Sequence, residues 1–210
     1  ELKRILSSRK DFALLLVLFL MEFTRGAFFL TFLPLYAVNY LSISVATAGL
    51  AVSAHYLVET LFKGAAGWQL DLRGHRVLST GLMLGMAALL FMKMSPSATV
   101  LMIGSAVFGL SVSPVWLAVI SGVAPVQSKD RAARMGIVFA VWLAGGGGGP
   151  VVINFFITYN YSLAFWLLIA LWGCALIVSA TMLTGLTGKT GGSSGFSFFK
   201  EVAKMAKNPT

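Results

Sequence analysis

Six long apolar stretches divide this sequence, and they constrain its fold more than any other feature. They cover residues 12–37, 44–70, 77–94, 98–123, 133–157 and 161–183. A helix needs about 20 mostly apolar residues to cross the hydrocarbon core of a bilayer. The chain is 58% hydrophobic and only 11% charged, a composition typical of membrane proteins. The sequence therefore predicts an all-α, polytopic membrane protein with a six-helix transmembrane bundle.

The basic residues are divided unevenly between the two sides of the predicted bundle. Thirteen of the 16 lysines and arginines lie in the two terminal segments or in the loops that follow the second and fourth spans. Lys93 alone lies on the other side, and Arg25 and Lys63 fall within spans. Short loops rich in lysine and arginine stay in the cytoplasm. We therefore expect both ends of this multi-pass chain to be cytoplasmic.

The sequence after the sixth span has a different character. We assign residues 1–186 to the transmembrane bundle and residues 187–210 to a cytoplasmic linker, which begins rich in Gly, Ser and Thr. Within it, residues 196–207 place apolar and basic side chains at helical spacing. This pattern suits an amphipathic helix on an anionic membrane surface, and a solvated linker is the alternative. We expect the chain to be part of a longer protein with a second six-helix half.

Five ionisable residues lie inside the first two spans, where charge is costly and marks function or pairing. They are Glu22, Arg25, His55, Glu59 and Lys63. Glu22 lies about 15 Å, and Glu59 about 16 Å, from the cytoplasmic ends of their oppositely directed spans at 1.5 Å per residue. The spacings of three and four residues place each set on one helix face. The sequence predicts that all five meet in one buried cluster.

Such a cluster suits proton coupling. Burial favours the neutral form of a carboxyl group and nearby cations favour its charged form, so a balanced acid can load and release a proton. We expect Glu22 and Glu59 to serve in this way, together with His55, because imidazole titrates near pH 6.5. Arg25 and Lys63 are expected to tune the acids and hold polar parts of a substrate. The alternative is a structural ion-pair network that joins the first two helices.

A motif after the second span indicates a family. Gly67, Asp71, Gly74 and Arg76 form the pattern G-x-x-x-D-x-x-G-x-R, with Arg73 inside it. In this position it resembles the signature loop of the major facilitator superfamily. The resemblance implies a bundle that forms one half of the fold, with this loop latching the cytoplasmic gate. Alternating access in such transporters comes from rocking one bundle against another.

The fifth span carries a second motif. Gly145, Gly149 and Pro150 resemble the start of the fifth-helix motif of proton antiporters in the same superfamily. Small residues allow close helix packing and proline bends a helix, so we expect bends here and at Pro114 in the fourth span. The chain departs from the antiporter pattern after the proline, where Ile153 and Asn154 replace glycines. We include the polar Asn154 among the expected substrate contacts.

A narrower resemblance covers most of the first 160 residues. The segments around Glu22, His55, Trp116 and Trp142 are similar to the Gram-positive flippases for the lipoteichoic-acid anchor glycolipid. That resemblance implies proton coupling and head-group binding by Glu22, Arg25 and Glu59. It also implies that Trp116 and Trp142 stack on sugar. The remaining tryptophans, Trp68, Trp166 and Trp172, are expected at the membrane interface or facing lipid.

These observations predict a proton-coupled secondary transporter of the bacterial cytoplasmic membrane that flips a glycolipid. Its expected partners are the bilayer, a glycolipid or another amphiphilic substrate, and protons, without nucleic acid. No cofactor is expected, because the proton gradient supplies the energy. No metal site is expected either, since Cys174 is the single cysteine. The alternatives are a multidrug–proton antiporter and, less favoured, a polytopic membrane enzyme or a scaffold.

Overall fold

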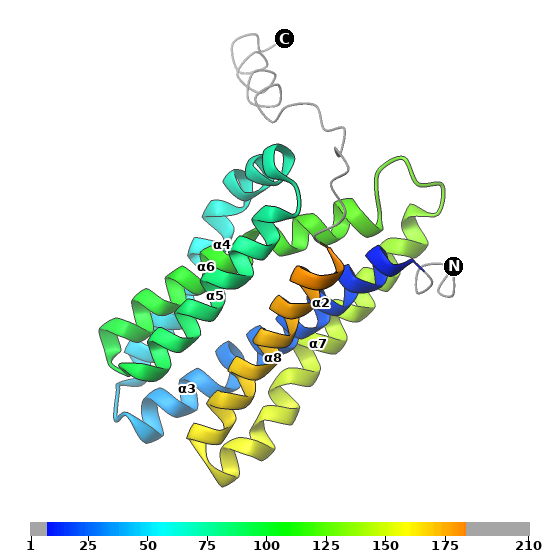
Figure 1. The fold of residues 1–210 in the computed structure, drawn as a ribbon. Coiled ribbons are helices and arrows are strands. Elements are labelled where there is room, and N and C mark those ends of the chain that lie inside the picture. Colours follow the sequence, from blue (N-terminus) through cyan, green and yellow to red (C-terminus); the bar gives the residue numbers. More distant parts are fainter. Residues whose placement is uncertain (1–7, 184–210) are drawn as a thin grey trace, which may run out of the picture.

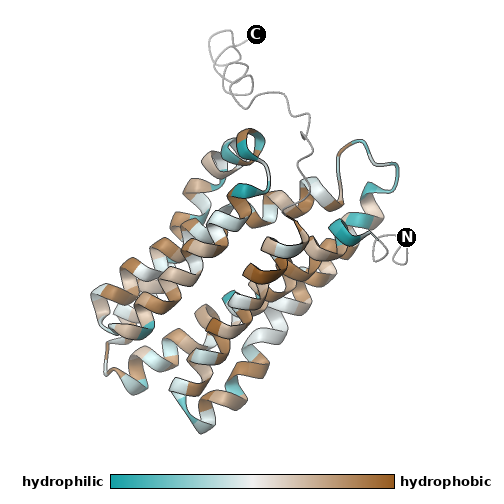
Figure 2. Cartoon of the chain, in the orientation of Figure 1, coloured by the Kyte–Doolittle hydropathy of each residue, from teal (hydrophilic) through white to brown (hydrophobic). Residues whose placement is uncertain are grey.

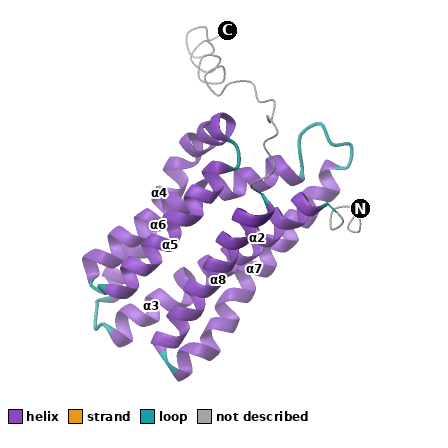
Figure 3. Cartoon of the chain, viewed as in Figure 1, coloured by secondary structure: helices purple, strands orange, loops and turns teal. Residues whose placement is uncertain are grey.

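The computed structural model describes residues 8–183, which form helices joined by short connections (Figure 3). The first span runs from Arg9 to Tyr40. It consists of α2 (Arg9–Gly26), a π-helical segment (Ala27–Phe32), α3 (Leu33–Leu35) and a second π-helical segment (Tyr36–Tyr40). The other five spans are α4 (Val45–Arg73), α5 (Arg76–Met94), α6 (Ala98–Val123), α7 (Arg131–Tyr159) and α8 (Tyr161–Met182).

All six spans are long and apolar enough to cross a membrane, which confirms the predicted fold class. The predicted linker and its amphipathic helix at 187–210 lie outside the described residues. Short polar side chains set the starts of four helices by accepting backbone hydrogen bonds. Ser8, Ser44 and Ser97 each accept the amide hydrogen of the residue three positions later, and Asn160 accepts those of Ser162 and Leu163.

The helices form two groups of three, α4 with α5 and α6, and α2 with α7 and α8 (Figure 1). The α4–α5 turn, the α6–α7 loop and the start of α2 lie at one end, where hydrophilic residues gather (Figure 2). Helix α2 contacts α6, α7 and α8. The first span and α6 are consequently the most buried, whereas α4 and α7 are largely exposed along their lengths.

The core corrects one prediction about the tryptophans. Trp172 is fully buried and its indole N–H donates to the Leu82 carbonyl oxygen at 2.8 Å. Its ring packs against Phe108 and fills the space beside Gly85. The expectation that Trp172 lies at the surface was therefore wrong, because the missing side chain of Gly85 makes room for the indole. Trp68 and Trp166 are about half exposed.

Candidate functional site

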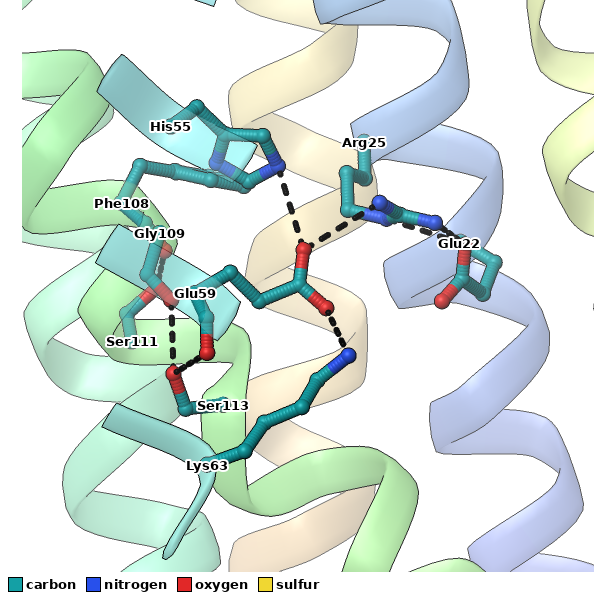
Figure 4. Close-up of polar contacts among 9 residues, drawn as sticks. All are labelled: Glu22, Arg25, His55, Glu59, Lys63, Phe108, Gly109, Ser111 and Ser113. Atoms are coloured by element: carbon teal, nitrogen blue, oxygen red, sulfur yellow. Dashed lines mark hydrogen bonds and ion pairs between the residues drawn. The ribbon is translucent and has the colours of Figure 1, made fainter. Parts of the chain in front are cut away.

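Helices α2 and α4 bring the five ionisable residues together (Figure 4). Glu22 lies 13 residues from the start of α2, and Glu59 lies 14 residues from the end of α4. At 1.5 Å per residue these depths are about 20 and 21 Å. The two acids therefore meet at the same level, and the prediction of one shared cluster is confirmed.

Arg25 joins the two acids. Its Nε and Nη2 donate to Glu22 Oε2 at 3.0 and 2.6 Å, and its Nη1 donates to Glu59 Oε2 at 3.4 Å. The guanidinium also lies 5.6 Å from the centre of the Tyr56 ring, a cation–π contact that the sequence analysis did not anticipate. Arg25 is therefore held firmly by α2 and more loosely by α4.

Glu59 is shared among several groups. Its Oε1 lies 3.1 Å from Lys63 Nζ, and its Oε2 faces both Arg25 and His55. Exposure rises across the cluster, because the side chain of Glu22 is 5% exposed, that of Glu59 is 14% and that of Lys63 is 42%. The cluster is therefore buried at Glu22 on α2 and exposed at Lys63 on α4.

His55 lies in the apolar wall of this cluster. Its ring is fully buried and stacks on Phe29, with ring centroids 3.9 Å apart and an interplanar angle of 10°. Its Nε2 lies 3.7 Å from Glu59 Oε2, beyond ordinary hydrogen-bond distance. The structure places His55 beside Glu59 as predicted. The imidazole packs against the acid and does not reach the exposed side of the cluster at Lys63.

Helix α6 holds α4 through two residues that the sequence analysis missed. A side chain at Gly109 would collide with the His55 carbonyl oxygen, so glycine there lets the two helices approach. One turn later, the Ser113 hydroxyl donates to the Glu59 carbonyl oxygen at 3.2 Å and to the Gly109 carbonyl oxygen at 3.0 Å. Both residues fix the α4 backbone that carries His55 and Glu59.

Helix α7 packs equally closely on the α2 backbone beside Glu22. A Cβ at Gly145 would lie 2.8 Å from the Phe19 carbonyl oxygen and 3.1 Å from Glu22 Cβ, and one at Gly149 would meet the Phe23 carbonyl oxygen. The predicted glycines of the fifth span therefore form a contact seam with α2. Pro150 in α7 and Pro114 in α6 lie inside their helices, and their bending roles stay predictions.

Trp116 and Trp142 come together from α6 and α7. Their ring centroids are 6.1 Å apart, and Phe139 contacts both at 5.6 and 6.3 Å. We call Trp116, Phe139 and Trp142 the aromatic triad. Both tryptophans are partly exposed and Phe139 is exposed. Trp116 and Trp142 lie roughly 10 and 16 Å from the ends of their helices, so the triad is nearer than the acids to the end where α2 begins.

Asn154 does not join these groups. It lies 12 residues beyond Trp142 on α7, about 18 Å away along the helix axis, and its side chain is exposed. Nothing in the described part of the chain connects it with the charge cluster. Its predicted substrate contact stays a prediction.

The signature motif differs in form from the predicted loop. Helix α4 continues to Arg73, so Gly67, Asp71 and Arg73 lie in its last turns and only Gly74 and His75 connect it to α5. A Cβ at Gly67 would make an ordinary contact of 3.4 Å with Leu117, so the packing there does not require glycine. Gly74 has φ of +60° and ψ of −146°, a conformation that strongly favours glycine.

The charged side chains of the motif point outward. Asp71, Arg73 and Arg76 are exposed, and within residues 8–183 the side chains of these three form no ion pair. The latch predicted for them is therefore not made inside this bundle.

A six-helix transmembrane bundle with a buried acid–base cluster is typical of membrane transporters. Comparison with known proteins gives the same class. The sequence profile of the Major Facilitator Superfamily matches residues 14–205, and the chain belongs to that superfamily. Its fold is similar to that of the peptide transporter POT bound to alafosfalin, with a TM-score of 0.72 at 20% identity over 94% of this chain and 44% of the other. A second POT structure, with sulfate, gives a TM-score of 0.73 at 19% identity, covering 99% of this chain and 47% of that one.

Relatives with more similar sequences are flippases. The chain is 32% identical over 161 residues to the proton-coupled antiporter flippase LtaA of Staphylococcus epidermidis, covering 73% of this chain and 38% of the relative. It is 34% identical over 158 residues to LtaA of Staphylococcus aureus, covering 72% and 38%. The chain thus spans less than two fifths of the aligned relatives' length. These relatives are transporters.

Proposed function

We propose that this chain is the first half of a proton-coupled transporter that flips a glycolipid of the lipoteichoic-acid anchor type. It would act in the bacterial cytoplasmic membrane by alternating access, with both ends of this segment in the cytoplasm. The observation that carries the proposal is the sharing of Glu59 by Arg25, Lys63 and His55 at mid-span. The similarity to proton-coupled flippases supports the substrate class.

The geometry supports different tasks for the two acids. Glu22 holds Arg25 through two hydrogen bonds within α2, whereas Glu59 supplies the charged contact between α2 and α4. A proton on Glu59 removes its attraction for both Arg25 and Lys63 and so loosens α4 from α2. Glu59 is therefore the proton carrier in this scheme. Glu22 keeps Arg25 in place, and His55 shapes the site around the carrier.

The aromatic triad supplies a surface for the sugar. Indole and phenyl rings offer apolar faces for sugar C–H groups, and each indole adds an N–H donor. The head group would rest there before it passes the charge cluster, where Lys63 and the Nη1 group that Arg25 otherwise donates to Glu59 can donate to its hydroxyls. The acyl chains would stay in the lipid throughout. Proton release would restore the Glu59 contacts and reset the site.

Alternating access requires a second bundle. The largely exposed helices α4 and α7 offer faces for it, and the outward-pointing Asp71, Arg73 and Arg76 would form the cytoplasmic latch with it. We therefore propose a second six-helix half as the partner of this one. The transporter as a whole, and not this half alone, would carry out transport.

The test uses the complete transporter in proteoliposomes. We expect fluorescent diglucosyl-diacylglycerol to move faster under an imposed pH gradient, and Glu59→Gln to abolish that response. Glu59→Asp is the matched control, because it keeps the carboxyl group and should retain part of the coupling. Loss of coupling in both variants would show that the position matters for packing and not for protonation.

A multidrug–proton antiporter is the second candidate. The aromatic triad favours it, because aromatic faces also bind cations and two acids lie beyond them. The same proteoliposomes loaded with a lipophilic cationic dye would distinguish the two functions. Proton-driven dye movement without glycolipid movement would replace the flippase proposal with the antiporter.

A further inference from the structure

A small cavity lies at the end of the bundle where α2 begins, apart from the charge cluster. It is lined by residues of α2, α4, the α4–α5 turn, α5 and α6, together with Leu183. Lys10 lines it and precedes Glu22 by 12 residues, which is about 18 Å along the helix. The cavity is therefore distinct from the charge cluster.

The cavity is lined by both apolar and polar side chains. Leu14, Leu70 and Leu78 supply apolar surface, and Lys10, His75 and Ser121 supply polar groups. No acidic residue lines it among the described residues. The nearest acid in sequence on α2, Asp11, is occupied by Arg134 at 3.2 Å. Such surroundings favour a negatively charged group.

The start of α5 strengthens this preference. His75 is the residue before α5, and its side chain makes no hydrogen bond to the helix end. The first amides of a helix carry partial positive charge and attract anions. His75 and Leu78 at the α5 start line the cavity together with Lys10, so the helix end adds to the positive charge of the lysine.

The cavity has room for a small anionic group. Its volume is about 70 Å³, enough for several water molecules. This space can hold a single phosphate group with adjoining apolar atoms.

We propose that this cavity binds the phosphate of an anionic phospholipid. Basic pockets between membrane helices on the cytoplasmic side are suited to lipid phosphates, and the uneven distribution of lysine and arginine places this end there. The phosphate would accept hydrogen bonds from Lys10 on α2 and His75 on the turn, beside Ser121, whose hydroxyl donates to the Ala118 carbonyl oxygen at 3.2 Å. It would thereby fix the α4–α5 turn, which carries Gly74 of the signature motif, against its neighbours.

The experiment measures lipid binding by the complete transporter in detergent, with native mass spectrometry and the thermal unfolding midpoint. The probes are phosphatidylglycerol, phosphatidylcholine and inorganic phosphate. We expect phosphatidylglycerol to bind and stabilise best, and Lys10→Gln/His75→Gln to weaken its binding on the order of tenfold, the effect of losing charge-assisted hydrogen bonds. Ser121→Leu, which narrows the cavity without changing charge, should also weaken it. Lys129→Gln is the matched control, because Lys129 is exposed in the α6–α7 loop outside the cavity.

Three outcomes would overturn the proposal. An equal loss in Lys129→Gln would show that the lipid responds only to overall surface charge. Equal stabilisation by inorganic phosphate would make this a site for free anions. Equal binding of phosphatidylcholine would remove the preference for an anionic head group. None of these measurements requires transport, so they stand independently of the proposed function.

Discussion

Two arginines are buried to the same extent in this bundle, and they are held in different ways. The side chain of Arg25 at mid-span is 14% exposed, and that of Arg134 at the start of α7 is 13% exposed. Arg134 Nη1 donates to Asp11 Oδ2 at 3.2 Å and to the Val123 carbonyl oxygen at 2.8 Å. Arg25 binds two acids, and one of these also contacts a lysine.

The difference is one of connection and not of burial. Arg134 on α7 binds one acid on α2 and one backbone carbonyl oxygen on α6. Asp11 has no second cation in this contact, so the link between α2 and α7 is lost when the pair breaks. Glu59 has several neighbours and can lose one contact while Arg25 keeps Glu22. An acid that several partners share beside an exposed lysine can exchange one contact for another, and we call such a cluster a switch. An ion pair with one acid and one base can only hold its helices together, and we call it a clamp.

Removal of either arginine should cause the largest loss of folding stability. Arg25→Gln and Arg134→Gln each leave a buried carboxylate without its cation, which costs about 3–5 kcal/mol for buried pairs. Unfolding of the purified transporter in mixed detergent micelles measures this. Similar losses would confirm that the two sites are equally costly to break, and a loss confined to Arg134→Gln would show that the Arg25 cluster is already well hydrated.

The sequence predicts the charge cluster because the required information is local. Residue counts from the span ends give the depths of Glu22 and Glu59, and helical spacing gives their faces. It does not predict the Asp11–Arg134 contact, which joins residues 123 positions apart and depends on how α2 meets α7.

Gly109→Ala should have the next largest effect. Its methyl group would collide with the His55 carbonyl oxygen and press on the Glu59 amide, and overpacking of this kind costs about 1–3 kcal/mol. Gly67→Ala is the control on the same pair of helices, because its methyl group would make only an ordinary contact of 3.4 Å with Leu117. Unfolding midpoints of both variants test this, and equal stability would show that α4 and α6 can separate without strain.

Gly109 and Trp172 show why packing escapes prediction from the sequence. A glycine within an apolar helix gives no signal until a carbonyl of another helix lies against it. Likewise, the apolar sequence of α8 has the same hydropathy whether Trp172 faces lipid or packs against Gly85 of α5. Both depend on which helix faces meet, and hydropathy does not record this.

Neutral double variants should separate the clamp from the switch. Glu22→Gln/Arg25→Gln and Asp11→Asn/Arg134→Gln each remove both charges of a pair, and both should unfold within about 2 kcal/mol of the parent protein, because removing a whole pair is often nearly neutral. Transport should persist only in the Asp11/Arg134 double variant. Persistent transport in the Glu22/Arg25 double variant would reduce the central cluster to a clamp.

Lys63→Gln should change folding least, because the lysine side chain is 42% exposed and exposed pairs contribute about 0–1 kcal/mol. Its effect should appear instead in transport, since Glu59 would lose the one partner that lies at the open edge while Arg25 remains. We expect a transport rate lowered severalfold, with Lys63→Arg restoring most of it, measured beside the unfolding midpoint of each variant. If Lys63→Gln destabilised the fold as much as Arg134→Gln, the lysine would belong to a closed structural network. The contrast between the two arginines would then fail at the residue where the central cluster is most open.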